Sequence, residues 1–132
     1  MRLVMPLPPN LANSRMQWRV KHHAKNNYWQ RCDNVQLLGE FGIFSCPSPP
    51  IAPFTKATGA ATLYVHQVMD EGNALNRLKW LEDWLVTRGY LEDDKPGCWR
   101  WVALPEQQID RMNPRVEISI APVVPPVVPF QP

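Results

Sequence analysis

The sequence predicts a small α/β (α+β) domain in which a mixed sheet packs against two main helices. Two stretches with apolar side chains at three- and four-residue spacing predict the helices. Short runs rich in β-branched and aromatic residues, bounded by proline or glycine, predict the strands. With 132 residues, the chain is long enough to bury one hydrophobic core. We therefore expect a single domain with the element order β-α-β-α-β-β.

The first half of the chain predicts one strand and one long helix. Residues 2–5 form a short strand that ends at the sequence PLPPN, because proline cannot donate to a sheet ladder. Residues 14–38 place apolar side chains along one helical stripe and basic side chains opposite it. Residues 46–53 contain four prolines and predict a loop.

The middle of the chain predicts a strand followed by the second helix. Residues 61–69 are rich in β-branched and aromatic side chains, so they predict a strand that delivers Asp70 at its end. Asn73 is a favourable N-cap, and Gly89 supplies a C-terminal stop. Between them, one helical face carries Ala74, Leu78, Leu81 and Leu85.

The last part of the chain predicts two strands and a tail. Residues 99–104 and 115–120 predict the strands, the second with alternating apolar side chains. The domain therefore spans residues 1–120. Residues 121–132 contain five prolines and predict a tail in polyproline II geometry, draped on the surface or disordered; a peptide ligand for an aromatic groove is the alternative.

The positions of the charged residues are more informative about possible binding partners than the net charge of +2. Residues 15–31 hold five Lys or Arg side chains and no acid. Such a stretch predicts contacts with a phosphate backbone, and a solvated helix face is the alternative. The candidate DNA-binding residues in it are Arg15, Arg19, Lys21 and Lys25.

The cysteines and the hydropathy pattern bear on the cellular compartment. Cys32, Cys46 and Cys98 have no metal-type spacing, and their odd number argues against a disulfide framework. No signal peptide and no apolar run of the roughly 20 residues that span a bilayer are found. We expect a soluble cytoplasmic protein with reduced thiols and no membrane contact.

Residues 70–94 carry the side chains that are typical of metal-assisted chemistry. Asp70 and Asp94 bracket an amphipathic helix that contains Lys79. Carboxylate oxygens are the ligands that Mg²⁺ prefers, and a nearby ammonium group can neutralise a phosphate. The segment therefore predicts phosphodiester chemistry, against the alternative that these are solvated surface charges.

In its order of residues, the same segment resembles the RusA-like Holliday junction resolvases, a family common in prophages. Their pattern is similar to D-x-D-N, a helix with a lysine, an aspartate one turn further on, and then G-[hydrophobic]-x-D-D. The N-terminal LPPNLANSRMQWRVKHHAKNNYW is also similar to the family's opening, so the resemblance covers roughly residues 1 to 120. The matching residues are Asp70, Asn73, Arg77, Lys79, Asp83, Gly89, Leu91, Asp93 and Asp94.

The resemblance implies a homodimer that nicks four-way DNA junctions in recombination or repair, with Mg²⁺ or Mn²⁺ as cofactor. Carried over by position, the catalytic residues are Asp70, Lys79 and Asp94, and the metal ligands are Asp70, Asp93 and Asp94. Asn73 and Arg77 join the basic segment as candidate DNA-binding residues. Lys79 lies four residues before Asp83, as in the family pattern, and Arg77 is the competing candidate for the phosphate.

Gly72 stands where the family pattern has its second aspartate. Mg²⁺ often needs only one or two protein carboxylates, so activity remains one hypothesis, with Glu71, Glu92 or Asp93 as replacement acids. A second hypothesis is a protein of the same fold that binds branched DNA without cleaving it. A third is a phage structural or regulatory protein.

Overall fold

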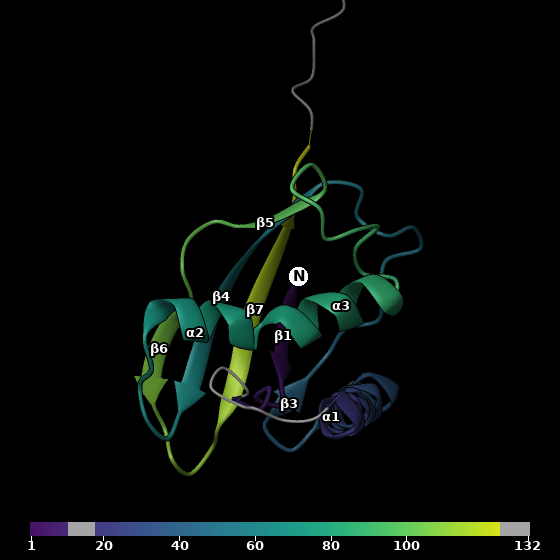
Figure 1. The fold of residues 1–132 in the computed structure, drawn as a ribbon. Helices are drawn as coiled ribbons and strands as arrows, with labels where there is room; N and C mark the ends of the chain where they lie inside the picture. Colours follow the sequence, from purple (N-terminus) through teal and green to yellow (C-terminus); the bar gives the residue numbers. More distant parts are fainter. Residues whose placement is uncertain (11–17, 125–132) are drawn as a thin grey trace, which may run out of the picture.

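In a computed structural model of the chain, residues 1–10 and 18–124 are described. Figure 1 shows their helices and strands around one sheet. In chain order the elements are β1 (Arg2–Met5), α1 (Trp18–Leu38), β2 (Glu40–Phe41), β3 (Phe44–Ser45), β4 (Ala57–Val65), α2 (Glu71–Arg77), α3 (Lys79–Thr87), β5 (Trp99–Trp101), β6 (Glu106–Ile109) and β7 (Arg115–Pro122).

The strands form one mixed sheet in the order β2-β3-β1-β7-β4-β5, and β6 also pairs with β4. β5 and β6 run parallel to β4 at its two ends, whereas β7 runs antiparallel to both β4 and β1. The predicted mixed α+β domain is therefore confirmed at this coarse level.

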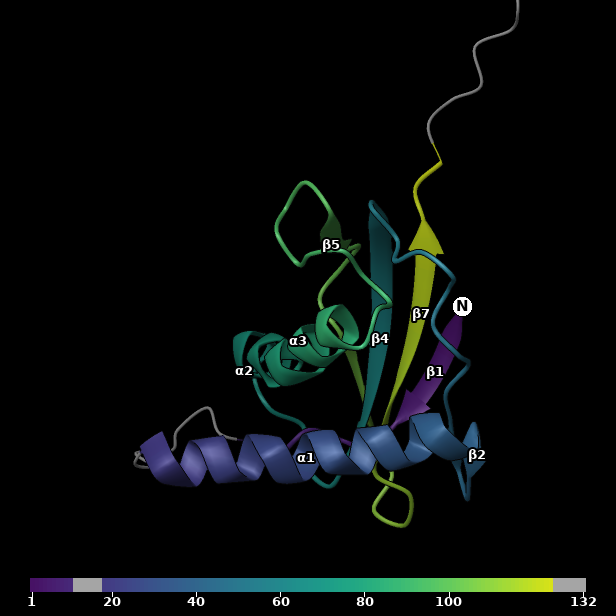
Figure 2. The ribbon, with the colours of Figure 1, turned by 90° about the vertical axis from the view of Figure 1, so that its right-hand side faces the viewer.

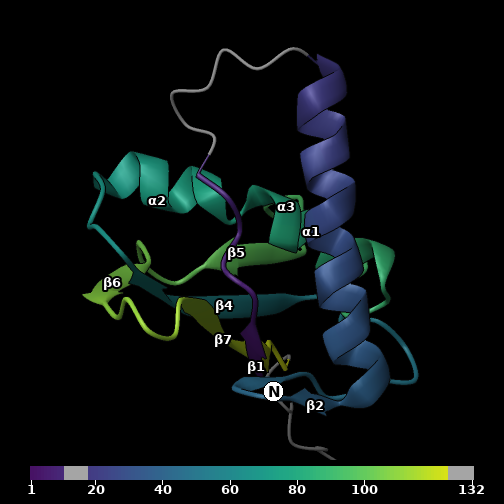
Figure 3. The same ribbon diagram turned by 90° about the horizontal axis from the view of Figure 1, so that it is seen from below.

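One face of the sheet packs against the helices. Along β4, alternate side chains are buried, and the residues between them are partly or fully exposed, as the two-residue period of a strand requires. Figures 2 and 3 show α1 crossing one end of the sheet while α2 and α3 lie over its face. α1 contributes Tyr28, Cys32 and Val35 to the core, on one helical stripe.

The helix predicted from the middle of the chain is confirmed, but it is divided at Leu78. The Leu78 N–H donates to the Leu75 carbonyl at 3.0 Å, a tighter turn than the α-helical one, and α3 then continues in nearly the same direction. Gly89 ends α3 with φ of 87°, as predicted. The four predicted core side chains are all fully buried: Ala74, Leu78, Leu81 and Leu85.

Several predicted boundaries are wrong. The central strand ends at Val65 instead of residue 69, and the strand predicted at 99–104 ends at Trp101. The short strands β2, β3 and β6 were not predicted, because their two to four residues carry no clear alternation of apolar side chains.

Other predictions agree with the structure or lie beyond its described part. The strand at residues 2–5 and the loop at 46–53 are confirmed. The last strand begins at Arg115, as predicted, and runs two residues further, to Pro122. The predicted start of the long helix at residues 14–17 and most of the tail, from residue 125 on, lie outside the described residues.

Two further observations bear on the expected compartment. All three cysteines are free thiols. Within residues 1–10 and 18–124, none of the helices combines the length and the apolar character that crossing a membrane requires.

Candidate functional site

Asp70 lies at the start of α2, where it caps the helix. Its Oδ1 accepts a hydrogen bond from the Asn73 backbone N–H at 2.9 Å, and its Oδ2 accepts one from the Asn73 side chain at 2.6 Å. The predictions that Asp70 ends a strand and that Asn73 is the N-cap are therefore wrong. The physical reason is that Asp70 competes well for the N-cap position, because a carboxylate also favours the positive end of the helix.

The backbone just before Asp70 is held by β6. The side-chain amide of Gln107 accepts from the Met69 N–H at 3.0 Å and donates to the Met69 carbonyl at 2.8 Å. This pair of bonds replaces the sheet pairing that the predicted longer strand would have given. Asp70 is consequently fixed relative to the sheet although it lies beyond the end of β4.

Gly72 lies in the first turn of α2, next to the capping carboxylate. Among residues 1–10 and 18–124, a Cβ at this position would meet only Oδ1 of Asp70, at 3.5 Å, an ordinary van der Waals contact. The backbone here does not require glycine, because its φ is not positive. An aspartate would therefore fit at position 72 and would add a second carboxylate beside Asp70.

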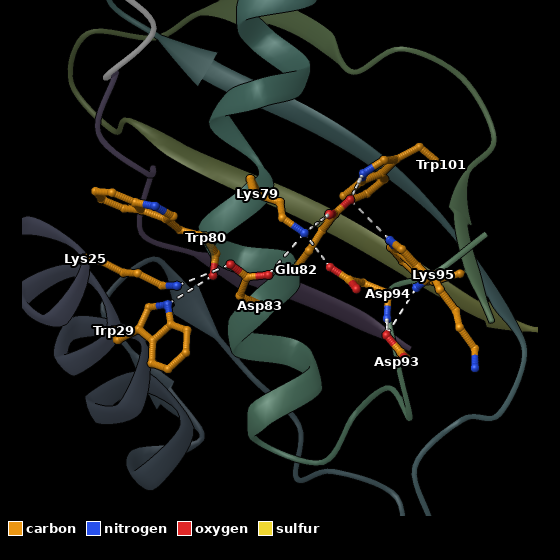
Figure 4. A network of polar contacts seen from close by, with 11 residues as sticks. Lys25, Trp29, Lys79, Trp80, Glu82, Asp83, Asp93, Asp94, Lys95 and Trp101 are labelled. Atoms are coloured by element: carbon orange, nitrogen blue, oxygen red, sulfur yellow. Dashed lines mark hydrogen bonds and ion pairs between the residues drawn. The ribbon is translucent and has the colours of Figure 1, made fainter. Parts of the chain in front are cut away.

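Lys79, in the first turn of α3, lies among three carboxylates (Figure 4). Its Nζ is 2.5 Å from Oδ2 of Asp94, 3.2 Å from Oδ1 of Asp83 and 4.0 Å from Oε2 of Glu82. The hydrogen bond to Asp94 is the main cause that raises the pKa of Lys79, and the same bond lowers the pKa of Asp94. The Lys79 side chain remains 58% exposed, so a phosphate can reach it from solvent.

Glu82 joins this cluster to the sheet and was not among the predicted site residues. Its Oε1 accepts hydrogen bonds from the ring N–H of Trp99, at 3.3 Å, and of Trp101. Burial is the main cause that raises the pKa of Glu82. The signal available in the sequence was weak: an acid three residues after Lys79, and two tryptophans on one face of a later strand.

Helix α1 brings one of its predicted cations to the cluster. Lys25 Nζ lies 3.3 Å from Oδ2 of Asp83 and 4.9 Å from the ring centre of Trp29. The Trp29 ring N–H in turn donates to the Trp80 carbonyl at 3.0 Å (Figure 4). Lys25, Asp83, Lys79 and Asp94 therefore form a row of alternating charges that crosses from α1 to the turn after α3.

The other predicted DNA-binding residues are placed differently. Arg19 and Lys21 are exposed in the first turn of α1, and Arg15 lies outside the described residues. Asn73 and Arg77, from α2, line a small hollow together with Lys79. The structure thus brings Asn73, Arg77 and Lys79 to one surface, with Lys25 close by.

The three predicted metal ligands do not fit one ion as a set. Asp93 Oδ1 accepts from the backbone N–H groups of Asp94 and Lys95. Asp70 lies nine residues before Lys79, about 13 Å along a helix axis, whereas Asp94 touches Lys79. Within residues 1–10 and 18–124, no three His, Cys, Asp or Glu side chains are grouped as ligands for a metal ion. We therefore assign no chemical step to a metal ion.

Comparisons of the chain with protein-family models, with curated proteins and with solved structures found no match.

Proposed function

We propose that this protein is an endonuclease that acts on branched DNA, with its reactive surface at Lys79 and Asp94. The observation that carries the proposal is their ion pair of 2.5 Å. These residues stand fifteen positions apart, and they are two of the three that the order of the motif assigns to catalysis. Their contact puts an exposed ammonium group and a carboxylate of low pKa side by side.

The surroundings of this pair suit a polyanionic substrate. Lys79 is held by carboxylates that a phosphate oxygen can replace, and Lys25 lies on the same row of charges. Arg19 and Lys21 extend the positive charge along α1 and supply contacts with the DNA backbone. A homodimer, as the resemblance implies, would present two such surfaces related by a two-fold axis to opposed strands of a junction.

A second candidate function is binding of branched DNA without cleavage. Two observations favour it: Gly72 puts no carboxylate at the position of the pattern's second aspartate, and both carboxylate oxygens of Asp70 are bonded to Asn73. In this case the phosphate-binding side chains act alone, and the protein would hold a junction for another factor.

The two candidates separate in a nicking assay on a synthetic four-way junction with Mg²⁺ or Mn²⁺. The endonuclease proposal expects the wild-type protein to nick the junction and to leave linear duplex of the same sequence intact. Binding without nicking, together with nicking by Gly72→Asp, would establish the second candidate instead. A folded protein that binds no branched DNA even at low salt would overturn both and favour a structural or regulatory role.

A further inference from the structure

A small hollow opens beside Lys79, between the segment that follows β1 and the junction of α2 with α3. Its volume is about 130 Å³, and Pro9 forms part of its wall. Three amide side chains, two cations and one indole complete the lining: Asn10, Asn73, Asn76, Arg77, Lys79 and Trp80. Figure 3 shows the chain after β1 extending toward α2.

The walls of the hollow are held in place before any ligand arrives. The Nε–H of Arg77 donates to the Pro8 carbonyl at 2.5 Å, and the hydroxyl of Tyr28 donates to the Pro6 carbonyl at 2.8 Å. The prolines of this segment have fixed φ angles, so the rim is stiff. Arg77 is only partly buried, and its guanidinium stays charged although burial lowers its pKa.

The lining has the chemistry of a site for a nucleobase. Amide groups supply both donors and acceptors to a base edge, an indole supplies an aromatic wall, and none of the described residues that line the hollow carries a carboxylate. Its volume is well below the roughly 300 Å³ at which sites for larger organic ligands begin, so it has room for one planar ring system only. Asn76 is exposed, and within the described part of the chain its side chain makes no hydrogen bond.

We propose that this hollow binds one unpaired nucleobase of the DNA strand whose phosphate lies at Lys79. The inference rests on the proposed function and makes it more specific: the substrate is branched DNA with a base free to leave its stack near the reactive phosphate. Asn76 contacts the edge of the base, Trp80 lies against it, and Arg77 and Lys79 contact the adjoining phosphates.

The test measures the affinities of the wild type and Asn76→Ala for a synthetic four-way junction and for junctions that lack one base each. Affinity is measured by fluorescence anisotropy without divalent metal. In the wild type, an abasic nucleotide at one position near the branch point should weaken binding by about five- to tenfold. Asn76→Ala should also weaken binding to the intact junction, and the abasic position should then have a smaller effect than in the wild type, because only the contact of the base with Trp80 is left to lose. Asn113→Ala, on an exposed turn, is the matched control and should bind as the wild type does.

Two results would overturn the inference while leaving the proposed function intact. One is tight junction binding that no abasic position weakens. The other is equal affinity of Asn76→Ala and Asn113→Ala for the intact junction. If the first result comes with binding of deoxynucleoside monophosphates to the wild type but not to Asn76→Ala, the hollow is a site for free nucleotides instead. A folded wild type that binds no junction overturns the proposed function and this inference together.

Discussion

The indole N–H of Trp84 donates a hydrogen bond of 2.8 Å to Oδ1 of Asp33, which ties α3 to α1. Trp84 is fully buried, and the guanidinium of Arg88 completes the link with two further bonds to the same carboxylate, at 2.7 and 2.8 Å. α3 carries Lys79 and α1 carries Lys25. The link from Asp33 to Trp84 and Arg88 therefore helps to set the distance between these two cations of the candidate site.

Loss of the Asp33 carboxylate should destabilise the fold. In Asp33→Ala the buried N–H of Trp84 has no acceptor, so the free energy of unfolding should fall by about 1–3 kcal/mol in urea titrations at pH 7. Asp110→Ala is the control, because it removes a partly exposed ion pair with Arg115 and keeps the acceptor of Trp84, so its loss should be smaller. Equal losses in the two variants would contradict this role of Asp33.

The same carboxylate predicts a dependence of stability on pH. The hydrogen bond from Arg88 is the main cause that lowers the pKa of Asp33. Its contribution is therefore present above the pKa of an unfolded aspartate, about 3.9, and is lost as the pH falls through the lower folded value. In urea titrations between pH 6 and 2.5, the free energy of unfolding should fall more steeply with decreasing pH for the wild type than for Asp33→Asn. Parallel curves for the two proteins would contradict the lowered pKa of Asp33.

Glu82 should behave as a buried acceptor whose charge is unfavourable. Because burial raises its pKa, the fold loses stability as the pH rises from the unfolded value, about 4.3, through the folded one. Glu82→Gln keeps an acceptor for Trp99 and Trp101 but cannot ionise. Its free energy of unfolding, relative to that of the wild type, should therefore rise between pH 4 and 7. Glu82→Leu leaves both indoles without that acceptor and should be less stable than Glu82→Gln by about 1–3 kcal/mol. Thermal or urea unfolding of the three proteins checks this order.

Gly59 is the position on β4 that makes room for Trp99. A Cβ there would lie 2.6 Å from Cζ2 of the indole and closer still to Cη2, so Gly59→Ala must displace the ring. We expect a loss of about 1–3 kcal/mol in the free energy of unfolding, as for other overpacked cores. Gly97→Ala is the matched control, because no atom of the described residues lies within 4 Å of a Cβ there. A similar change in the free energy of unfolding in both variants would mean that the Trp99 ring moves aside without cost.

The basic side chains at the start of α1 should contribute to the salt dependence of DNA binding. If Arg19 and Lys21 each contact one phosphate, the double variant Arg19→Ala/Lys21→Ala should reduce the slope of log K against log salt by about 2. Anisotropy titrations between 50 and 200 mM salt measure this slope. Lys56→Ala/Arg111→Ala removes the same charge from exposed positions elsewhere, and an identical slope change there would indicate only a net-charge effect.

The sequence predicted the parts of the structure that depend on local periodicity. The buried face of α2 and α3 and the stop at Gly89 follow from helical spacing and from the positive φ that glycine accepts. β6 was missed because its side chains, EQQI, are mostly exposed and its pairing with β4 is non-local. Asp70 was assigned to the end of a strand instead of to the N-cap of α2. Aspartate and asparagine both favour the N-cap position, so local sequence did not distinguish Asp70 from Asn73.

The candidate site could be predicted only in part, because several of its contacts join residues that are far apart in the sequence. Lys79 and Asp94 were named together because motif order pairs them, and the structure brings them into contact. Glu82 could not be identified in advance, because its bonds to Trp99 and Trp101 span 17 and 19 residues and depend on how α3 packs on β5. Lys25 was predicted as a basic side chain, but its pairing with Asp83 depends on the crossing of α1 and α3.

The most direct measurement of the central claim is junction nicking by proteins altered at the ion pair itself. Asp94→Asn should retain junction binding in anisotropy, and Lys79→Met should weaken it only by the loss of one phosphate contact. Both variants should lose nicking in Mg²⁺ by at least about 100-fold, as for removal of other groups that act at a reacting centre. Asp110→Asn, an acid outside the site, should nick as the wild type does. Nicking at the wild-type rate by either ion-pair variant would contradict the assignment of Lys79 and Asp94 to the reactive surface.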